Sequence, residues 1–148
     1  MPESPPRWPA YARVPPFLPV PLRARGDGWT PERQARFVGL LAETGSVAEA
    51  ARRVGLTRES AWRLRRRIGA ASFAHAWDAV VALRRGEPAA KRKVTLDELS
   101  DYVIDGPYVV RMRRRRFLRA QREPSTSALL RHMRRLDAAA ERGGWEDW

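Results

Sequence analysis

The stretch Val47–Arg66, VAEAARRVGLTRESAWRLRR, decides the fold of this chain. It predicts two short helices that cross closely, with only a few residues between them. That geometry requires a small residue at the crossing and a turn that glycine adopts cheaply, and Ala51 and Gly55 stand at those positions. The inward positions are all apolar: Ala50, Val54, Leu56, Ala61 and Leu64. This spacing favours a helix-turn-helix over an ordinary helical hairpin, which follows the same packing rules.

Capping residues place both helices of this unit. Ser46 and Glu49 form a Ser-x-x-Glu pattern, which predicts a capping box and a helix over Val47–Val54. Thr57 predicts the start of the next helix, about Arg58–Ile68, which the following glycine ends.

A further helix is predicted before this unit. Thr30 is a good N-cap, Pro31 suits the first helical position, and Gln34 stands near the capping-box position. Gly45 ends this helix, and its apolar residues recur at helical spacing: Phe37, Leu40 and Leu41.

In a helix-turn-helix, the second helix enters the major groove with its N-terminal residues toward the base edges. The candidate DNA-contacting residues are therefore the outward ones: Thr57, Arg58, Glu59, Trp62, Arg63, Arg66 and Arg67. Arg bonds guanine in a bidentate manner, and Thr reaches phosphate or base. Four arginines late in the helix suit backbone phosphates or simple solvation: Arg63, Arg65, Arg66 and Arg67.

Two of these candidates have alternative roles. Glu59 either accepts a hydrogen bond from a cytosine amine or orients Arg63 one turn away. Trp62 either contacts a sugar or thymine methyl, or packs against Phe73 or Trp77 of the next helix; the packing role is favoured.

These residues resemble a group of bacterial and prophage helix-turn-helix proteins that includes regulators and proteins similar to phage small terminase subunits. The resemblance spans roughly residues 28–83. It implies a trihelical fold and DNA binding, and it leaves regulation and DNA packaging both open. It is carried by Gly28-Trp29-Thr30-Pro31-Glu32-Arg33-Gln34, Phe37, Leu41-Ala42-Glu43-Thr44-Gly45-Ser46-Val47, Ala50-Ala51, Arg58-x-Ser60-Ala61-Trp62-x-Leu64-Arg65 and Phe73-Ala74-x-Ala76-Trp77-Asp78.

Composition agrees with a polyanionic partner. The 148 residues include 29 Lys and Arg against 17 Asp and Glu, for a net charge of +12, which indicates nucleic acid or an anionic surface. With no cysteine, no signal-like start and no apolar run near the ~20 residues that span a bilayer, we expect a cytoplasmic, nucleoid-associated protein without membrane contact. The chain carries no enzyme motif, so no catalytic residue, metal or cofactor is predicted.

The predicted organisation has four parts. A proline-rich extended arm covers 1–28, and its Trp8, Tyr11, Phe17 and Leu18 are expected to lie across the core. The DNA-binding domain covers 29–86 and includes a fourth helix over about Ser72–Arg85. A basic linker covers 87–94, and a basic C-terminal region covers 95–148.

The C-terminal region begins with a Thr95-Leu96-Asp97-Glu98 capping box and a helix to about Ile104. Asp97, Glu98, Asp101 and Asp105 are interpreted as a solvated helix face rather than a Mg²⁺ site. A hairpin of Tyr108–Met112 and Arg116–Gln121 follows, and then a helix over Thr126–Arg142. The apolar stripe of that helix suits either self-association or packing on the core.

The predicted hairpin holds the densest positive cluster, and its candidate DNA-contacting residues form the turn and its flank: Arg113, Arg114, Arg115 and Arg116. Alternation with Val110, Met112, Phe117 and Leu118 predicts that many arginines share one face. Such a face follows phosphates without reading sequence. Alternatively, the hairpin mediates self-association, with its arginines keeping an edge soluble.

The sequence thus predicts a mainly α-helical protein: a trihelical helix-turn-helix core plus a fourth helix, with a small basic hairpin-and-helix C-terminal region. The favoured function is a transcriptional regulator that inserts the helix 58–68 in the major groove of double-stranded DNA. A small terminase-like packaging protein of a prophage is one alternative. RNA binding through the Arg-rich segment 111–122 is the other.

Overall fold

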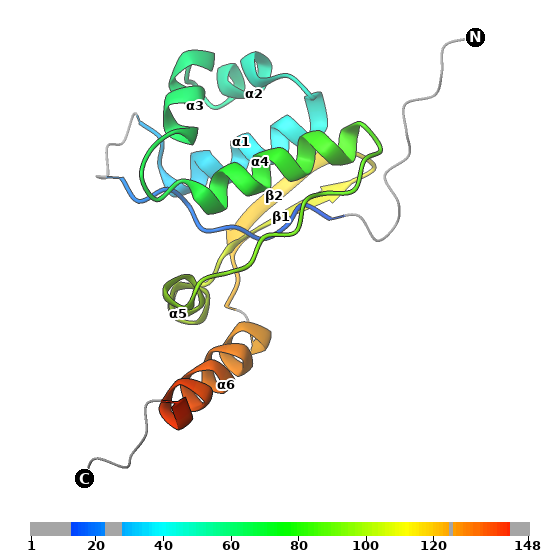
Figure 1. Cartoon of the computed structure of the whole chain (residues 1–148). Coiled ribbons are helices and arrows are strands. Elements are labelled where there is room, and N and C mark those ends of the chain that lie inside the picture. Colours follow the sequence, from blue (N-terminus) through cyan, green and yellow to red (C-terminus); the bar gives the residue numbers. More distant parts are fainter. Residues whose placement is uncertain (1–12, 23–27, 125, 143–148) are drawn as a thin grey trace.

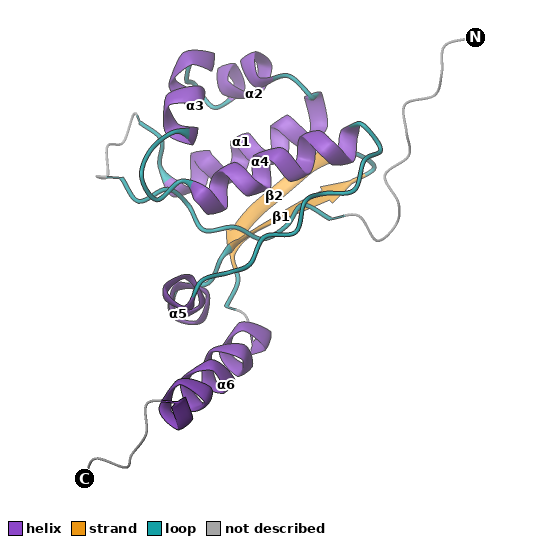
Figure 2. Ribbon diagram, viewed as in Figure 1, coloured by secondary structure: helices purple, strands orange, loops and turns teal. Residues whose placement is uncertain are grey.

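A computed structural model describes residues 13–22, 28–124 and 126–142. The protein is mainly helical, with a small two-stranded antiparallel sheet, as the sequence predicts (Figures 1 and 2). The elements of these residues are α1 (Pro31–Thr44), α2 (Val47–Arg53), α3 (Arg58–Arg65), α4 (Ala71–Arg84), α5 (Leu96–Ile104), β1 (Tyr108–Arg113), β2 (Arg116–Arg122) and α6 (Thr126–Arg142).

Helices α1 and α4 form the central layer of the molecule. In Figure 1, α2 and α3 lie on one side of this layer and the β1–β2 hairpin lies on the other. The contacts agree, because α3 packs against α2 and α4 whereas both strands pack against α1. The first helix begins as predicted, with the Thr30 hydroxyl accepting from the Arg33 amide, and it ends at Gly45 with a φ of 72°.

An aromatic cluster fills the space inside this layer. Phe37 lies at its centre, with ring centroids 5.1 Å from Trp77, 5.2 Å from Trp29 and 6.1 Å from Phe73. Phe37 and Phe73 are completely buried, so α1 and α4 are joined mainly by apolar packing.

The N-terminal segment 13–22 is part of the same core. Phe17 is completely buried against Phe73, exchanges two backbone hydrogen bonds with Tyr108, and thereby joins the edge of β1. The Leu18 amide donates to the Ser72 hydroxyl at 2.8 Å. The expectation that Phe17 lies across the core is therefore confirmed, whereas the side chain of Leu18 is only half-buried and is not among the described residues of the core cluster. Trp8 and Tyr11 fall outside the described residues.

Gln34 has a role that differs from the predicted one. It lies in the first turn of α1, but its side chain is completely buried and ties the N-terminal segment to the helix instead of capping it. Its Oε1 accepts from the Val20 amide at 2.6 Å, while its Nε2 donates to the carbonyls of Val20 and Trp29, each at 3.1 Å. The N-cap of α1 involves Thr30 and the Arg33 amide instead.

The hairpin exists close to where it was predicted, with a shorter turn. The strands extend to Arg113 and from Arg116, so the turn is Arg114–Arg115 rather than Arg113–Arg115. Val110, Met112 and Phe117 pack toward the core as expected, and Tyr108 does so as well. Leu118 does not, because it directly follows the inward-facing Phe117 and is the extra residue of a β-bulge, and it is 58% exposed.

Helices α5 and α6 pack against each other, next to the main body (Figure 1). The predicted Thr95–Glu98 capping box begins α5, with both reciprocal hydrogen bonds present. Helix α6 does not pack on the core, and its apolar stripe stays 40–53% exposed: Leu129, Leu130, Met133 and Leu136.

Candidate nucleic-acid interface

The α2–turn–α3 unit has the geometry expected from its spacing. Ala51 is completely buried at the crossing, and Gly55 turns the chain with a φ of 79°. The Leu56 amide donates to the Ala51 carbonyl at 2.9 Å, which closes the end of α2. Thr57 and Ser60 then form a capping box that starts α3. These contacts fix the direction of α3 relative to α2 at the first turn of α3.

The capping of α2 is only partly as predicted. The Ser46 hydroxyl accepts from the Glu49 amide, as expected. The Glu49 carboxylate does not return to Ser46. It accepts from Arg52 and Arg53, and these hydrogen bonds keep the pKa of Glu49 below its ordinary value. Glu49 therefore neutralises part of the positive charge that Arg52 and Arg53 bring to the C-terminal end of α2.

Helix α3 is shorter than predicted. It ends at Arg65, where the amides of Arg66 and Arg67 turn back to Arg63 and Leu64, three residues earlier. Ile68, the predicted last residue, is 99% exposed, because no apolar surface covers this turn in the described residues. Arg66 and Arg67 consequently lie just after the C-terminal end of α3 rather than on its outward face.

The outward face of α3 presents the other candidates. Thr57, Arg58, Glu59 and Arg63 are exposed, as is Arg66. Arg58, Arg63 and Arg66 line a shallow hollow together with Glu59 and Trp62. Within the described residues, no ion pair engages these three guanidinium groups, and none joins Glu59 to Arg63. The hollow is thus open and positively charged.

Trp62 packs rather than projecting freely. Its ring centroid lies 4.8 Å from that of Trp77, which confirms the packing role for this residue. The Arg65 guanidinium covers both rings, at 5.9 Å from Trp62 and 5.2 Å from Trp77, and pairs with Asp78 at 2.8 Å. Arg65 therefore joins α3 to α4. The interpretation of this residue as an arginine that faces phosphate or solvent is wrong.

The hairpin brings the second set of candidates together. Arg113, Arg114 and Arg116 are exposed at its end, and Arg115 is partly buried there. Arg111 pairs with Glu123 at 2.9 Å, and the two hydrogen bonds from Arg111 are the main reason why the pKa of Glu123 is lowered. The sequence places Arg119 in the same basic cluster but not among the candidate contacts, and its place opposite Arg111 depends on the register of the strands.

The side of the hairpin that faces α1 is closely fitted. The Phe117 amide donates to Glu43 at 3.1 Å, and Glu43 also pairs with Arg53 of α2 at 2.8 Å. The Phe117 ring lies directly over Gly39, where a Cβ would overlap it. Glycine at this helical position therefore serves close packing with the hairpin.

We expect Gly39→Ala to destabilise the protein by about 1–3 kcal/mol, because overpacking by one methyl displaces the Phe117 ring. Alanine favours helix over glycine by about 1 kcal/mol, which opposes this loss without removing it. Urea unfolding measures the difference. In a double-mutant cycle, Phe117→Ala should relieve the clash, so that the double variant loses less than the sum of the single variants. Stabilisation by Gly39→Ala alone would contradict the packing argument.

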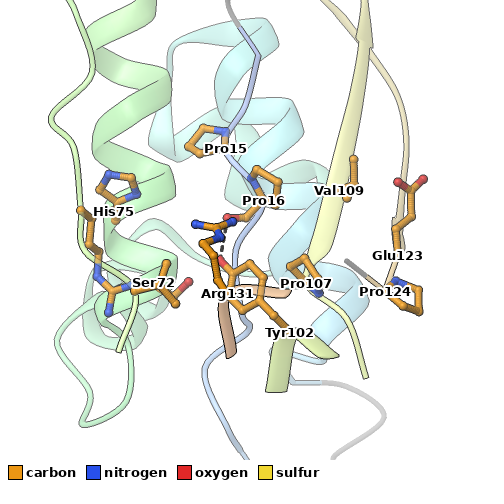
Figure 3. Close-up of a pocket in the computed structure, with 12 residues that line it drawn as sticks. Pro15, Pro16, Ser72, His75, Tyr102, Pro107, Val109, Glu123, Pro124 and Arg131 are labelled. Carbon is orange, nitrogen blue, oxygen red and sulfur yellow. Dashed lines mark hydrogen bonds between the residues drawn. The ribbon is translucent and has the colours of Figure 1, made fainter. Parts of the chain in front are cut away.

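A separate cleft of about 380 Å³ lies between the core and α5–α6 (Figure 3). Its polar groups already have partners within the protein. The Tyr102 hydroxyl donates to the Pro16 carbonyl at 3.1 Å, His75 contacts the Ala90 carbonyl at 2.7 Å, and Arg92 pairs with Glu98. The cleft joins two parts of the fold and is a weaker candidate than the exposed arginines of α3.

No protein-family model, curated protein or solved structure matches this chain. The resemblance to bacterial and prophage helix-turn-helix proteins therefore stays a prediction. None of the helices in the described ranges is long and apolar enough to cross a bilayer.

Proposed function

We propose that α1, α2 and α3 form a trihelical helix-turn-helix unit that binds double-stranded DNA, and that the protein is a transcriptional regulator. In this proposal α3 enters the major groove with its N-terminal end toward the bases. The single observation that carries the proposal is the outward face of α3, where Arg58, Arg63 and Arg66 are exposed and have no acidic partner among the described residues.

The contacts that hold α3 in place support this role. A helix that reads bases needs a fixed orientation, since hydrogen bonds to base edges tolerate little displacement. The Thr57 capping box fixes the beginning of α3, and the stack of Trp62, Trp77 and Arg65 fixes its end against α4. The packed face and the charged face of α3 are thus clearly separated.

The position along α3 suggests which residues read bases. Thr57, Arg58 and Glu59 occupy the first turn, which approaches the base edges in this docking geometry, and Arg63 lies one turn later. Arg66 and Arg67 lie where the chain leaves the helix, which suits phosphates at the groove edge. Base reading and backbone contact are thereby assigned to different residues.

We expect Arg58→Ala to weaken binding to a selected DNA site by about 1–3 kcal/mol and to relax the base preference at one position. The reason is the loss of a bidentate contact with guanine. Selection of bound sequences from a random pool identifies the site, and fluorescence anisotropy measures affinity for that site and for random DNA. Arg134→Ala on α6 is the matched control. Equal losses on both DNAs for Arg58→Ala would exclude direct base reading by this residue.

A DNA-packaging role uses the same α3 surface, and one observation favours it as the second candidate. The half-exposed apolar stripe of α6 suits self-association, which a packaging protein needs to encircle DNA. Native mass spectrometry separates the two functions: a dimer supports regulation, and a larger closed ring supports packaging.

A further inference from the structure

We propose that the β1–β2 hairpin binds the phosphate backbone of a second DNA duplex, so that one chain bridges two duplexes. The inference rests on the proposed function for the first duplex, which α3 holds. The second surface consists of the outward residues of the hairpin and is called the hairpin arginine face: Arg111, Arg113, Arg116 and Arg119.

The register of the hairpin sets like charges directly opposite each other. Arg111 pairs across the strands with Arg119, and Arg113 pairs with Arg116. Like charges in such positions destabilise a hairpin. Glu123 compensates Arg111, but no ion pair within the described residues engages Arg113, Arg116 or Arg119. A polyanion would relieve this repulsion.

The turn adds a second unfavourable feature. Arg114 and Arg115 have φ values of 50° and 68°, a region in which turns of this kind carry Asn or Gly. A side chain other than glycine is strained in this region, so two arginines here lower stability. Unfavourable backbone at a charged tip is typical of a functional surface, and the exposed Arg114 adds positive charge next to the hairpin arginine face.

The chemistry of this face favours a duplex backbone. Its aromatic neighbours Tyr108 and Phe117 turn inward to the core, so no ring of the two strands is presented to stack on an unpaired base. Recognition of single-stranded RNA depends on such stacking, whereas phosphate contacts need only placed cations. Packing on α1 and the Phe117–Glu43 hydrogen bond hold these cations in place.

The position of this face requires a second duplex. The hairpin and α3 lie on opposite sides of the α1–α4 layer (Figure 1), and a helix layer is about 10 Å thick. A straight duplex seated against the outer face of α3 does not extend to the far side of that layer. The two basic surfaces consequently serve two duplexes.

The test is a bridging assay with the full chain. A biotinylated duplex with the selected site is held on beads, and a fluorescent duplex of unrelated sequence is added. We expect the wild type to capture the fluorescent duplex. The hairpin variant R113A/R116A/R119A should keep the first duplex and lose capture of the second by at least about tenfold, because three phosphate contacts are lost. The control K93A/R134A/R142A removes equal charge outside both surfaces and should retain capture.

A variant of α3, R58A/R63A/R66A, separates this inference from the proposed function. It should lose the sequence preference and still bind one unrelated duplex in a gel-shift assay, with affinity that falls steeply as salt rises. Loss of all DNA binding by this variant would overturn the inference and leave the proposed function standing. An unchanged sequence preference would refute the proposed function, and the same gel shift would still report the hairpin.

Three further results would overturn the bridging inference. The first is a wild-type chain that captures no second duplex. The second is a hairpin variant that bridges as well as the wild type, because bridging would then come from the α3 surfaces of two copies. The third is competition in which a structured RNA, but not unrelated duplex DNA, binds the α3 variant, because the hairpin would then be an RNA-binding surface. Circular dichroism of each variant checks that these exposed substitutions leave the fold intact.

Discussion

Phe37→Ala is expected to lower the free energy of unfolding by about 3–5 kcal/mol, a large share of the about 5–15 kcal/mol that a protein of this kind has. Phe37 is completely buried and contacts the rings of Trp29, Phe73 and Trp77. Truncation removes the transfer free energy of the ring and leaves a cavity that these rigid neighbours close only in part.

The loss should be cooperative, because α1 carries Phe37 and contacts α2, α4 and both strands. The midpoint temperatures of thermal unfolding measured by circular dichroism and by tryptophan fluorescence should therefore fall together. Trp29 and Trp77 contact the Phe37 ring, so their fluorescence reports the cavity directly. Leu118→Ala is the matched control, since this side chain is 58% exposed and should cost little. A loss below about 1 kcal/mol for Phe37→Ala would mean that the aromatic cluster is not the centre of the core.

The sequence predicts local structure well where local physics determines it. Thr30, Ser46, Thr57 and Thr95 all accept the N-terminal amide hydrogen bonds expected of caps, because a cap depends on only a few consecutive residues. The packing of Trp62 was also predictable, since the next helix offers a large aromatic at reachable spacing.

The remaining errors involve competition between several possible partners of one side chain. Glu49 leaves its capping position for two arginines on the same helix, and Arg65 turns from solvent to Trp77 and Asp78. The spacing of residues along the chain does not show which of its possible partners a side chain will bind. The exposed arginines of α3 were predictable because their face has no such competitor among the described residues.

The core also continues across the predicted boundaries. Val20 from the proline-rich arm, and Tyr108 and Val110 from β1, belong to the same buried cluster as the four helices of the central domain. Hydrophobic periodicity within one segment gives no information on which other segment covers it. The position of the hairpin on α1, and therefore the separation of the two basic surfaces, required the three-dimensional structure.

Gln34→Leu is expected to cost of order 3 kcal/mol, although leucine has a similar size and a favourable helix propensity. The change leaves one backbone amide and two carbonyls without the partners that Gln34 provides, those of Val20 and of Trp29. Each unsatisfied buried group costs about 1–3 kcal/mol, and partial access of water after local opening reduces the sum.

The effect should begin at the N-terminal segment 13–22, which Gln34 connects to α1. Urea unfolding measures the total loss, and amide hydrogen exchange should show that Val20 loses protection before the helices do. Gln121→Leu, on the exposed side of β2, is the matched control and should change stability little. If Val20 kept its protection in Gln34→Leu, the apolar contacts of Val14, Phe17 and Val20 would be sufficient to hold the segment, and the buried amide would be dispensable.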